Sequence, residues 1–187
     1  MNKILLVICS VLLSLNAGAL ELAGIQLADK AQVGNASLQL NGAGIRTKLF
    51  FKVYIGALYL TQKQTSGEAI IADEREHRMM LHMLRELSSE KLFDAFNDAI
   101  EANHTPAELA ALDAQLKQMA QIFEVVKEVK PGDLITLDYL PASGTQISVN
   151  GTTRGTIPGV AFSRAMLRIW LGSKPVQEDL KKGLLGG

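Results

Sequence analysis

The sequence predicts an α+β fold in which helices pack on an antiparallel sheet. Before residue 61, in residues 78–85 and between residues 134 and 157, apolar and turn-forming segments alternate as in strands and hairpins. Between the last two regions, residues 88–123 carry two apolar stripes at helical spacing, and another helical segment follows Pro158-Gly159. Strands, then helices, then a hairpin, then helices is an order typical of α+β proteins.

The first 19 residues are expected to be an export signal outside the folded domain. Lys3 provides a positive start, an apolar run follows from Ile4 to Leu15, and Ala17-Gly18-Ala19 has the small-residue pattern of a cleavage site. An uncleaved anchor is the alternative, but the apolar run is short for a membrane span of about 20 residues. We therefore expect cleavage after Ala19, a single domain over residues 20–187, and a periplasmic or secreted product.

Composition excludes several classes of protein. Lys and Arg number 19, as do Asp and Glu, and this balance argues against nucleic-acid binding, which needs a concentrated basic face. Cys9 is the only cysteine and lies in the signal, so disulfides do not stabilise the domain. No other apolar run is long enough for a membrane span. His82 has no second ligand at metal spacing, so neither a metal nor another cofactor is predicted.

The segment Gly42–Leu60 is expected to be the central strand. Asn41-Gly42 forms a turn signal before it, and Gly44 allows a bend, a bulge or a close approach by a ligand. Side-chain alternation assigns one face to the core and gives the other a mixture of aromatic and cationic residues. The predicted core face carries Leu49, Phe51, Val53 and Ile55, and the mixed face carries Arg46, Lys48, Phe50, Lys52 and Tyr54.

Local end signals define the other elements. Ser88 and Ser89 offer an N-cap, and Thr105-Pro106-Ala107-Glu108 is a capping box, which predicts a helix continuing to Phe123. Residues 29–35 are expected to form a polar turn, and Asn150-Gly151 a tight hairpin turn. One helix is expected to end at Gly172, and Pro175 is expected to open a last helix that ends at Leu185.

Arg46 and Tyr54 form the candidate binding site. Arginine binds a carboxylate through two parallel donors, and a tyrosine hydroxyl adds a third donor beside an apolar wall. Their separation is even, which places both on one face of a strand. Such a pair suits an acid with an apolar tail. An amphipathic strand with snorkelling lysines is the alternative interpretation of the same residues.

Three stretches resemble the chalcone isomerase-like family, and in particular its exported bacterial members. They are GAGIRTKLFFKVYIGALYL at 42–60, LRELSSEKLFDAFNDAI at 84–100, and GTIPGVAFSRAMLRIWLGSKPVQEDLKKGLLG at 155–186. The resemblance implies an open-faced β-sandwich, a large antiparallel sheet with helices layered on it and a ligand cleft between them.

The family contains isomerases, which close chalcones into flavanones, and fatty-acid binders. Arg46 matches the arginine that both kinds share, which steadies an oxyanion in the enzymes and holds a carboxylate in the binders. Tyr54 matches the binders' tyrosine, with Tyr59 as a substitute. Ser88 or Ser89 falls near the enzymes' tyrosine, which is therefore missing.

The resemblance favours a non-catalytic periplasmic protein that binds a fatty acid or similar apolar acid through Arg46 and Tyr54, with Tyr59 and Ser88 as further candidates. Two alternatives stay open. One is an isomerase that acts on a chalcone or flavonoid-like phenol through Arg46. The other is an interaction or assembly factor of the envelope, in which Arg46 is structural.

Overall fold

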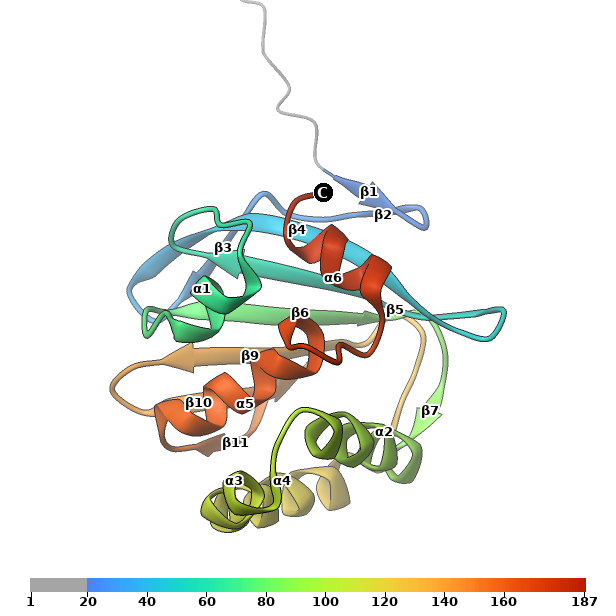
Figure 1. Cartoon of the computed structure of the whole chain (residues 1–187). Helices are drawn as coiled ribbons and strands as arrows, with labels where there is room; N and C mark the ends of the chain where they lie inside the picture. Colours follow the sequence, from blue (N-terminus) through green and yellow to red (C-terminus); the bar gives the residue numbers. More distant parts are fainter. Residues whose placement is uncertain (1–19) are drawn as a thin grey trace, which may run out of the picture.

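A computed structural model describes residues 20–187 and contains a strongly curled, seven-stranded antiparallel sheet (Figure 1). The signal predicted for residues 1–19 lies outside the described residues. The strand order is β11-β10-β9-β6-β5-β4-β3, and two short ribbons, β1-β2 and β7-β8, lie outside this sheet. The strands are β1 Glu21–Leu22, β2 Ile25–Gln26, β3 Lys30–Val33, β4 Ala36–Lys48, β5 Phe51–Leu60, β6 His77–Met83, β7 Leu87–Ser88, β8 Glu128–Val129, β9 Leu134–Leu140, β10 Gly144–Val149 and β11 Thr152–Ile157.

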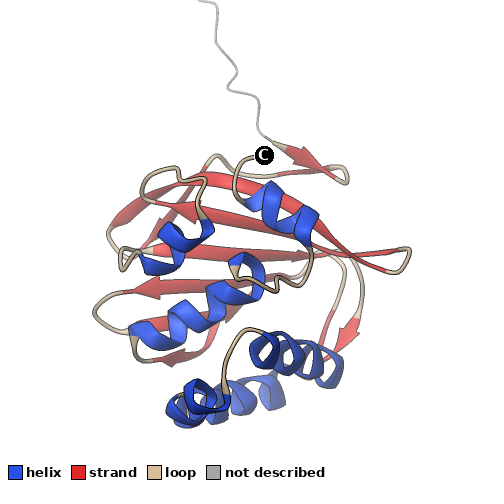
Figure 2. Cartoon of the chain, viewed as in Figure 1, coloured by secondary structure: helices blue, strands red, loops and turns tan. Residues whose placement is uncertain are grey.

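The helices gather on one face of the sheet (Figure 2). Helix α5 packs on β10, α6 packs on β4 and β5, and α2 and α4 pack together beside α5 and β11. The predicted α+β class and the layering of helices on an antiparallel sheet are therefore confirmed. The helices are α1 Gly67–Ala72, α2 Ser89–Ala102, α3 Pro106–Ala111, α4 Asp113–Val126, α5 Val160–Leu171 and α6 Glu178–Leu184.

The segment Gly42–Leu60 is a hairpin, so the prediction of one continuous strand was wrong. The chain reverses at Leu49 and Phe50, and Lys48 pairs with Phe51 across the turn. Leu49 and Phe51 were predicted to lie in the core but are exposed. The alternation of apolar residues continues through the reversal, and neither turn residue is a glycine, proline or asparagine, so pattern alone hides the turn.

Asn41-Gly42 was also misassigned, because both residues are buried within β4. The pairing register with β5 shifts between Leu40 and Gly42, as at a β-bulge. The Asn41 amide donates to the carbonyl oxygens of Gln64 and Leu184 at 2.9 and 2.8 Å, and its Oδ1 accepts from the Gln64 N–H at 2.7 Å. Asparagine is also common in turns, so the sequence alone does not distinguish Asn41, which makes long-range hydrogen bonds, from a turn residue.

Three boundaries differ from the predictions. The expected polar turn at residues 29–35 contains edge strand β3, whose Val33 packs into a buried cluster. The helix predicted to run to Phe123 breaks at Leu112 into α3 and α4, and the last helix begins at Glu178 rather than at Pro175. The N-cap at Ser88, the capping box at Thr105 and the turn at Asn150-Gly151 are confirmed.

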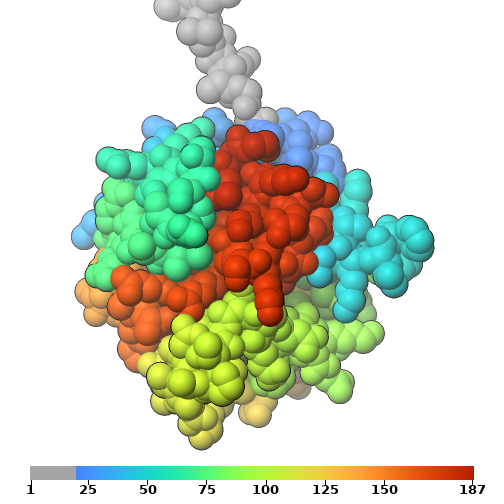
Figure 3. Space-filling view, viewed as in Figure 1, coloured from blue at the N-terminus to red at the C-terminus, as the bar shows by residue number. Residues whose placement is uncertain are grey.

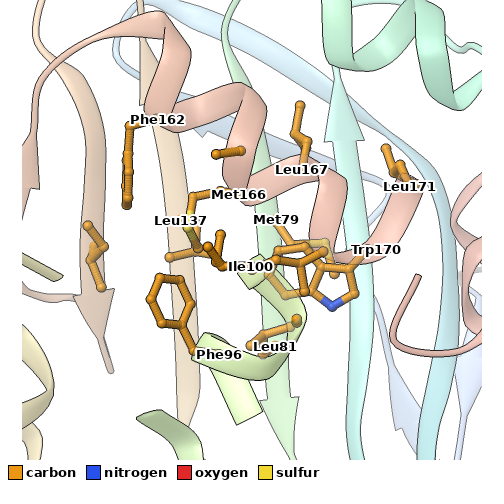
Figure 4. Packing of buried hydrophobic residues seen from close by; sticks show 14 of the residues in the cluster. Met79, Leu81, Phe96, Ile100, Leu137, Phe162, Met166, Leu167, Trp170 and Leu171 are labelled. Carbon is orange, nitrogen blue, oxygen red and sulfur yellow. The ribbon is translucent and has the colours of Figure 1, made fainter. Parts of the chain in front are cut away.

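Two buried clusters lie on opposite faces of the sheet. The larger one fills the space between the sheet and the helices and includes Phe96, Phe162 and Trp170 (Figure 4). The smaller one lies inside the curl, where β3 contacts β6 and β9 in addition to pairing with β4. Alternation along β5 sends Tyr54 and Leu58 toward the helices, and Ile55 and Tyr59 into the curl.

His77 makes the folding free energy dependent on pH. It is buried against Tyr139 with ring centroids 5.1 Å apart, and burial lowers its pKa, opposed in part by its bond to the Arg75 carbonyl and by Asp73 and Asp138. Its Nε2 lies 3.1 Å from Ser163 Oγ. Because the folded state holds the neutral ring, stability is full above the unfolded pKa of about 6.5 and falls as pH drops below it.

We therefore expect His77→Gln to reduce the loss of unfolding free energy between pH 7.5 and 5.5 by about 1 kcal/mol. Urea denaturation at the two pH values measures the difference. Equal losses in parent and variant would show that His77 is not the group responsible.

Candidate functional site

Arg46 and Tyr54 lie directly opposite each other on β4 and β5. Opposite residues of an antiparallel pair share a face of the sheet, and here that face is the helix side, since Tyr54 packs against the larger cluster. The structure thus brings the predicted pair together. It does so across a hairpin, not by the even spacing along one strand on which the prediction was based.

The Arg46 guanidinium is held at one nitrogen only. Its NH1 donates to the Thr47 carbonyl oxygen at 2.7 Å and to Gln177 Oε1 at 3.2 Å. The Gln177 side chain also accepts from the Thr47 N–H at 2.8 Å and donates to the Ile45 carbonyl oxygen at 3.3 Å, so it fixes this stretch of β4. Within residues 20–187 no ion pair involves Arg46, and Nε and NH2 have no hydrogen-bond partner. One edge of the guanidinium is therefore free to donate.

Tyr54 is held from the helix layer. Trp170 of α5 donates its indole N–H to the Tyr54 hydroxyl oxygen at 3.0 Å. Burial raises the pKa of Tyr54, and the Trp170 bond and the positive charge of Arg46 offset part of that rise. The phenol therefore stays protonated near neutral pH. Because its oxygen is the acceptor toward Trp170, its own O–H remains available to donate to another group.

Two hollows on the described residues lie away from this pair. One, with a volume of about 730 Å³, lies along α1 and α5 and includes Arg164, Arg168 and Lys181. The other, of about 290 Å³, surrounds Asn41 and Gln64. Neither includes Arg46 or Tyr54. The space between sheet and helices, where the resemblance predicts a cleft, holds the side chains of the larger buried cluster. An apolar ligand would have to displace some of them.

Comparison with known proteins places the chain in a family. A family model described as chalcone isomerase-like matches residues 19–186. The chain belongs to the chalcone isomerase-like family. The resemblance predicted from residues 42–60, 84–100 and 155–186 is therefore confirmed.

The fold of this chalcone isomerase-like protein is shared with a solved plant structure, a fatty-acid binding protein of Arabidopsis thaliana. The TM-score is 0.67 at 14% sequence identity, and the alignment covers 87% of this chain and 92% of the plant chain. At 14% identity the similarity establishes a shared fold and nothing about the ligand. No curated protein sequence matches the chain.

The structure does not bring Tyr59 or Ser88 to Arg46. Tyr59 points into the curl, on the opposite face of the sheet, where burial raises its pKa and the charge of Arg78 partly offsets the rise. Ser88 caps α2, with its Oγ accepting from the Lys91 N–H at 3.4 Å. The neighbouring Ser89 donates its hydroxyl to the Phe123 carbonyl oxygen. Both serines therefore have structural bonds in this chalcone isomerase-like protein.

Two residues of the site were missed by sequence reasoning. Trp170 was expected only as an apolar residue of the helix, and Gln177 was not singled out. An indole N–H in a core needs an acceptor, so Trp170 did carry a signal that a polar partner lies nearby. Gln177 precedes two acidic residues at the start of α6, which marks a helix start but not a side chain that reaches back to β4.

Residues 20–187 contain neither a cluster of metal-ligating side chains nor a membrane-spanning helix. No three His, Cys, Asp or Glu side chains converge there as metal ligands would. No helix in the same range has the length and apolar character to cross a membrane. The Asp94 and Asp98 carboxylates on α2 are exposed to solvent.

Proposed function

We propose that this chalcone isomerase-like protein is an exported, non-catalytic binder of a fatty acid or similar apolar acid, in the periplasm or outside the cell. Arg46 and Tyr54 hold the carboxylate. The observation that carries the proposal is a half-buried arginine without a carboxylate partner in residues 20–187, directly opposite a protonated tyrosine on the helix side of the sheet. Export rests on the signal pattern in residues 1–19.

The free edge of Arg46 suits a carboxylate. Nε and NH2 form a planar fork that can donate two parallel hydrogen bonds to the two oxygens of one carboxylate. The Tyr54 hydroxyl supplies a third donor. Gln177 holds the NH1 side in place, so the fork is oriented before a ligand arrives and little side-chain entropy is lost on binding.

The apolar tail would lie between the sheet and the helices. Met79, Met83 and Met166 belong to the buried cluster that Tyr54 packs against. Methionine side chains are unbranched and adapt to irregular space, so they can rotate aside at lower cost than branched or aromatic residues. The fold shared with a plant fatty-acid binding protein supports the same ligand class.

Small molecules released by denaturing the purified protein test the proposal. We expect mass spectrometry to find an acid at stoichiometric amounts in the parent and in the Arg154→Ala control, whose arginine is exposed on β11. In Arg46→Ala the acid should be depleted, with affinity for added fatty acid lowered about 10- to 100-fold by the loss of charged hydrogen bonds. Arg46→Lys should recover only part of the affinity, because an ammonium lacks the planar fork.

Equal binding by Arg46→Ala and the parent would overturn the proposal. A folded parent that neither carries nor binds an acid would do so as well, and would favour the isomerase and assembly alternatives. Arg46 and the Tyr54 hydroxyl could also hold the oxygen of a chalcone. Loss of chalcone absorbance above the spontaneous rate would support an isomerase, and a crosslinked envelope partner without turnover would support an assembly factor.

A further inference from the structure

The tip of the β4–β5 hairpin carries a compact group of exposed apolar side chains. Leu49, Phe50 and Phe51 are 82%, 94% and 53% exposed. Figure 3 shows the hairpin projecting from the rounded body of the molecule. Three large apolar side chains on a convex projection contribute nothing to the two buried clusters, so the core does not explain their presence.

The backbone of the turn does not explain them either. Leu49 has a φ of +56°, in the left-handed region that favours glycine or asparagine. At the β10–β11 turn the same chain uses Asn150 and Gly151, with φ of 51° and 76°. Leucine at Leu49 is therefore a poorer turn former than the chain uses elsewhere. A residue that weakens local folding and gains no burial indicates a role outside folding.

Cations surround the apolar tip. Lys48 and Lys52 flank it in the sequence, and the Arg85 guanidinium lies 4.1 Å from the centroid of the Phe51 ring. Between residues 30 and 67 the chain has no Asp or Glu. An apolar tip flanked by three long basic side chains matches an anionic bilayer surface, where the apolar groups enter the acyl boundary and the cations stay at the phosphates.

We propose that the β4–β5 tip docks the protein on the surface of a bilayer that contains anionic phospholipids. Leu49 and Phe50 enter the interface, and Lys48, Lys52 and Arg85 contact lipid phosphates. Three side chains on a projection present far less area than the roughly 1,200 Å² of a stable protein interface, which disfavours a second copy or another protein as the occupant. Docking does not depend on ligand binding by Arg46, although Arg46 and Tyr54 are the third residue pair from the turn of the same hairpin.

Vesicle flotation tests the docking. We expect the parent to float with vesicles of phosphatidylglycerol and phosphatidylcholine at low salt, and to float much less with pure phosphatidylcholine. The double variant Leu49→Asn/Phe50→Gly should bind at least tenfold more weakly while melting close to the parent, because asparagine adopts the positive φ of residue 49 more readily than leucine does. Val125→Ser is the matched control, since Val125 is 62% exposed on α4, and it should bind like the parent.

Two further variants separate the contributions. Lys48→Gln/Lys52→Gln should lower binding to phosphatidylglycerol vesicles severalfold and leave the weak binding to phosphatidylcholine unchanged. Phe50→Trp should show a blue shift of emission when vesicles are added, against the constant signal of Trp170, which is buried.

The proposal is overturned if the parent does not float with phosphatidylglycerol vesicles or if Leu49→Asn/Phe50→Gly floats equally well. A tip-dependent dimer that binds no vesicles would also overturn it, in favour of a second copy as the occupant.

Discussion

Gly42→Ala is expected to lower the free energy of unfolding by about 3 kcal/mol, at the upper end of overpacking effects. A Cβ at this position would overlap the Gly183 carbonyl oxygen and lie 2.8 Å from the Gly186 nitrogen and the Leu184 carbonyl oxygen. All three are backbone atoms of α6 and the residues after it, so no side-chain rotation relieves the overlap. The helix itself would have to move off the sheet.

Glycines form the contact surface between α6 and the sheet. Leu180 of α6 rests on Gly44 and Gly56, where a Cβ would lie 3.1 and 3.3 Å from its Cδ1. A Cβ on Gly183 would lie 2.5 Å from the Ala43 carbonyl oxygen. The sequence analysis allowed for a close approach by a ligand at Gly44, but in this structure a helix of the same chain, α6, lies against both Gly42 and Gly44.

Thermal denaturation measures the effect, and about 3 kcal/mol corresponds to a melting temperature roughly 6–12 °C lower for a domain of this size. Gly183→Ala should also destabilise the protein, even though alanine is the better helix former by about 1 kcal/mol. Gly187→Ala, where the nearest neighbour is 3.4 Å away, should change little. An unchanged melting temperature for Gly42→Ala would contradict the close packing of α6.

The same substitution should weaken acid binding if Arg46 is the carboxylate ligand. Gln177 immediately precedes α6 and accepts the hydrogen bond from Arg46 NH1. A displaced α6 takes Gln177 with it and leaves the guanidinium less ordered. Stability and ligand affinity should therefore fall together in Gly42→Ala, while Arg46→Ala should lower affinity alone.

Elements defined by local chemistry were predicted well from the sequence. A capping box specifies its helix start within four residues, as at Thr105, and the Asn150-Gly151 turn needs only the conformational preferences of two residues. The amphipathic stripes of α2, α4 and α5 likewise report which side is buried. These signals depend only on residues that are close in the sequence, so they can be recognised without knowledge of the fold.

Features that depend on distant contacts were not predictable in this way. Asn41 has turn chemistry by composition, yet its side chain bonds residues 23 and 143 positions away. The reversal at Leu49 uses residues that turns disfavour, so its local signal points to a strand. Arg46 was identified by its chemistry and Tyr54 by its spacing, but Gln177, which orients Arg46, lies 131 positions away and left no local pattern.

The Arg78–Asp138 ion pair is expected to contribute strongly to the free energy of unfolding. It lies on the face of the sheet away from the helices, inside the curl. Arg78 Nε and NH2 donate to the two Asp138 carboxylate oxygens at 2.6 and 2.5 Å, and NH2 also donates to the Gln32 carbonyl oxygen at 3.3 Å. The side chains are only 22% and 9% exposed. The pair thus joins β6 to β9 and reaches β3, where the sheet curls over its smaller cluster.

Asp138→Ala is expected to lower the unfolding free energy by about 3 kcal/mol, because it leaves a largely buried guanidinium without its counter-charge. Chemical denaturation measures this loss, and Asp113→Ala is the control, since its pair with Lys117 is exposed and contributes at most about 0.5 kcal/mol. The double variant Arg78→Met/Asp138→Leu should recover most of the stability, because no charge then remains buried. If the double variant were as unstable as Asp138→Ala, the loss would come from the geometry that the ion pair imposes on the curl and not from desolvation of Arg78.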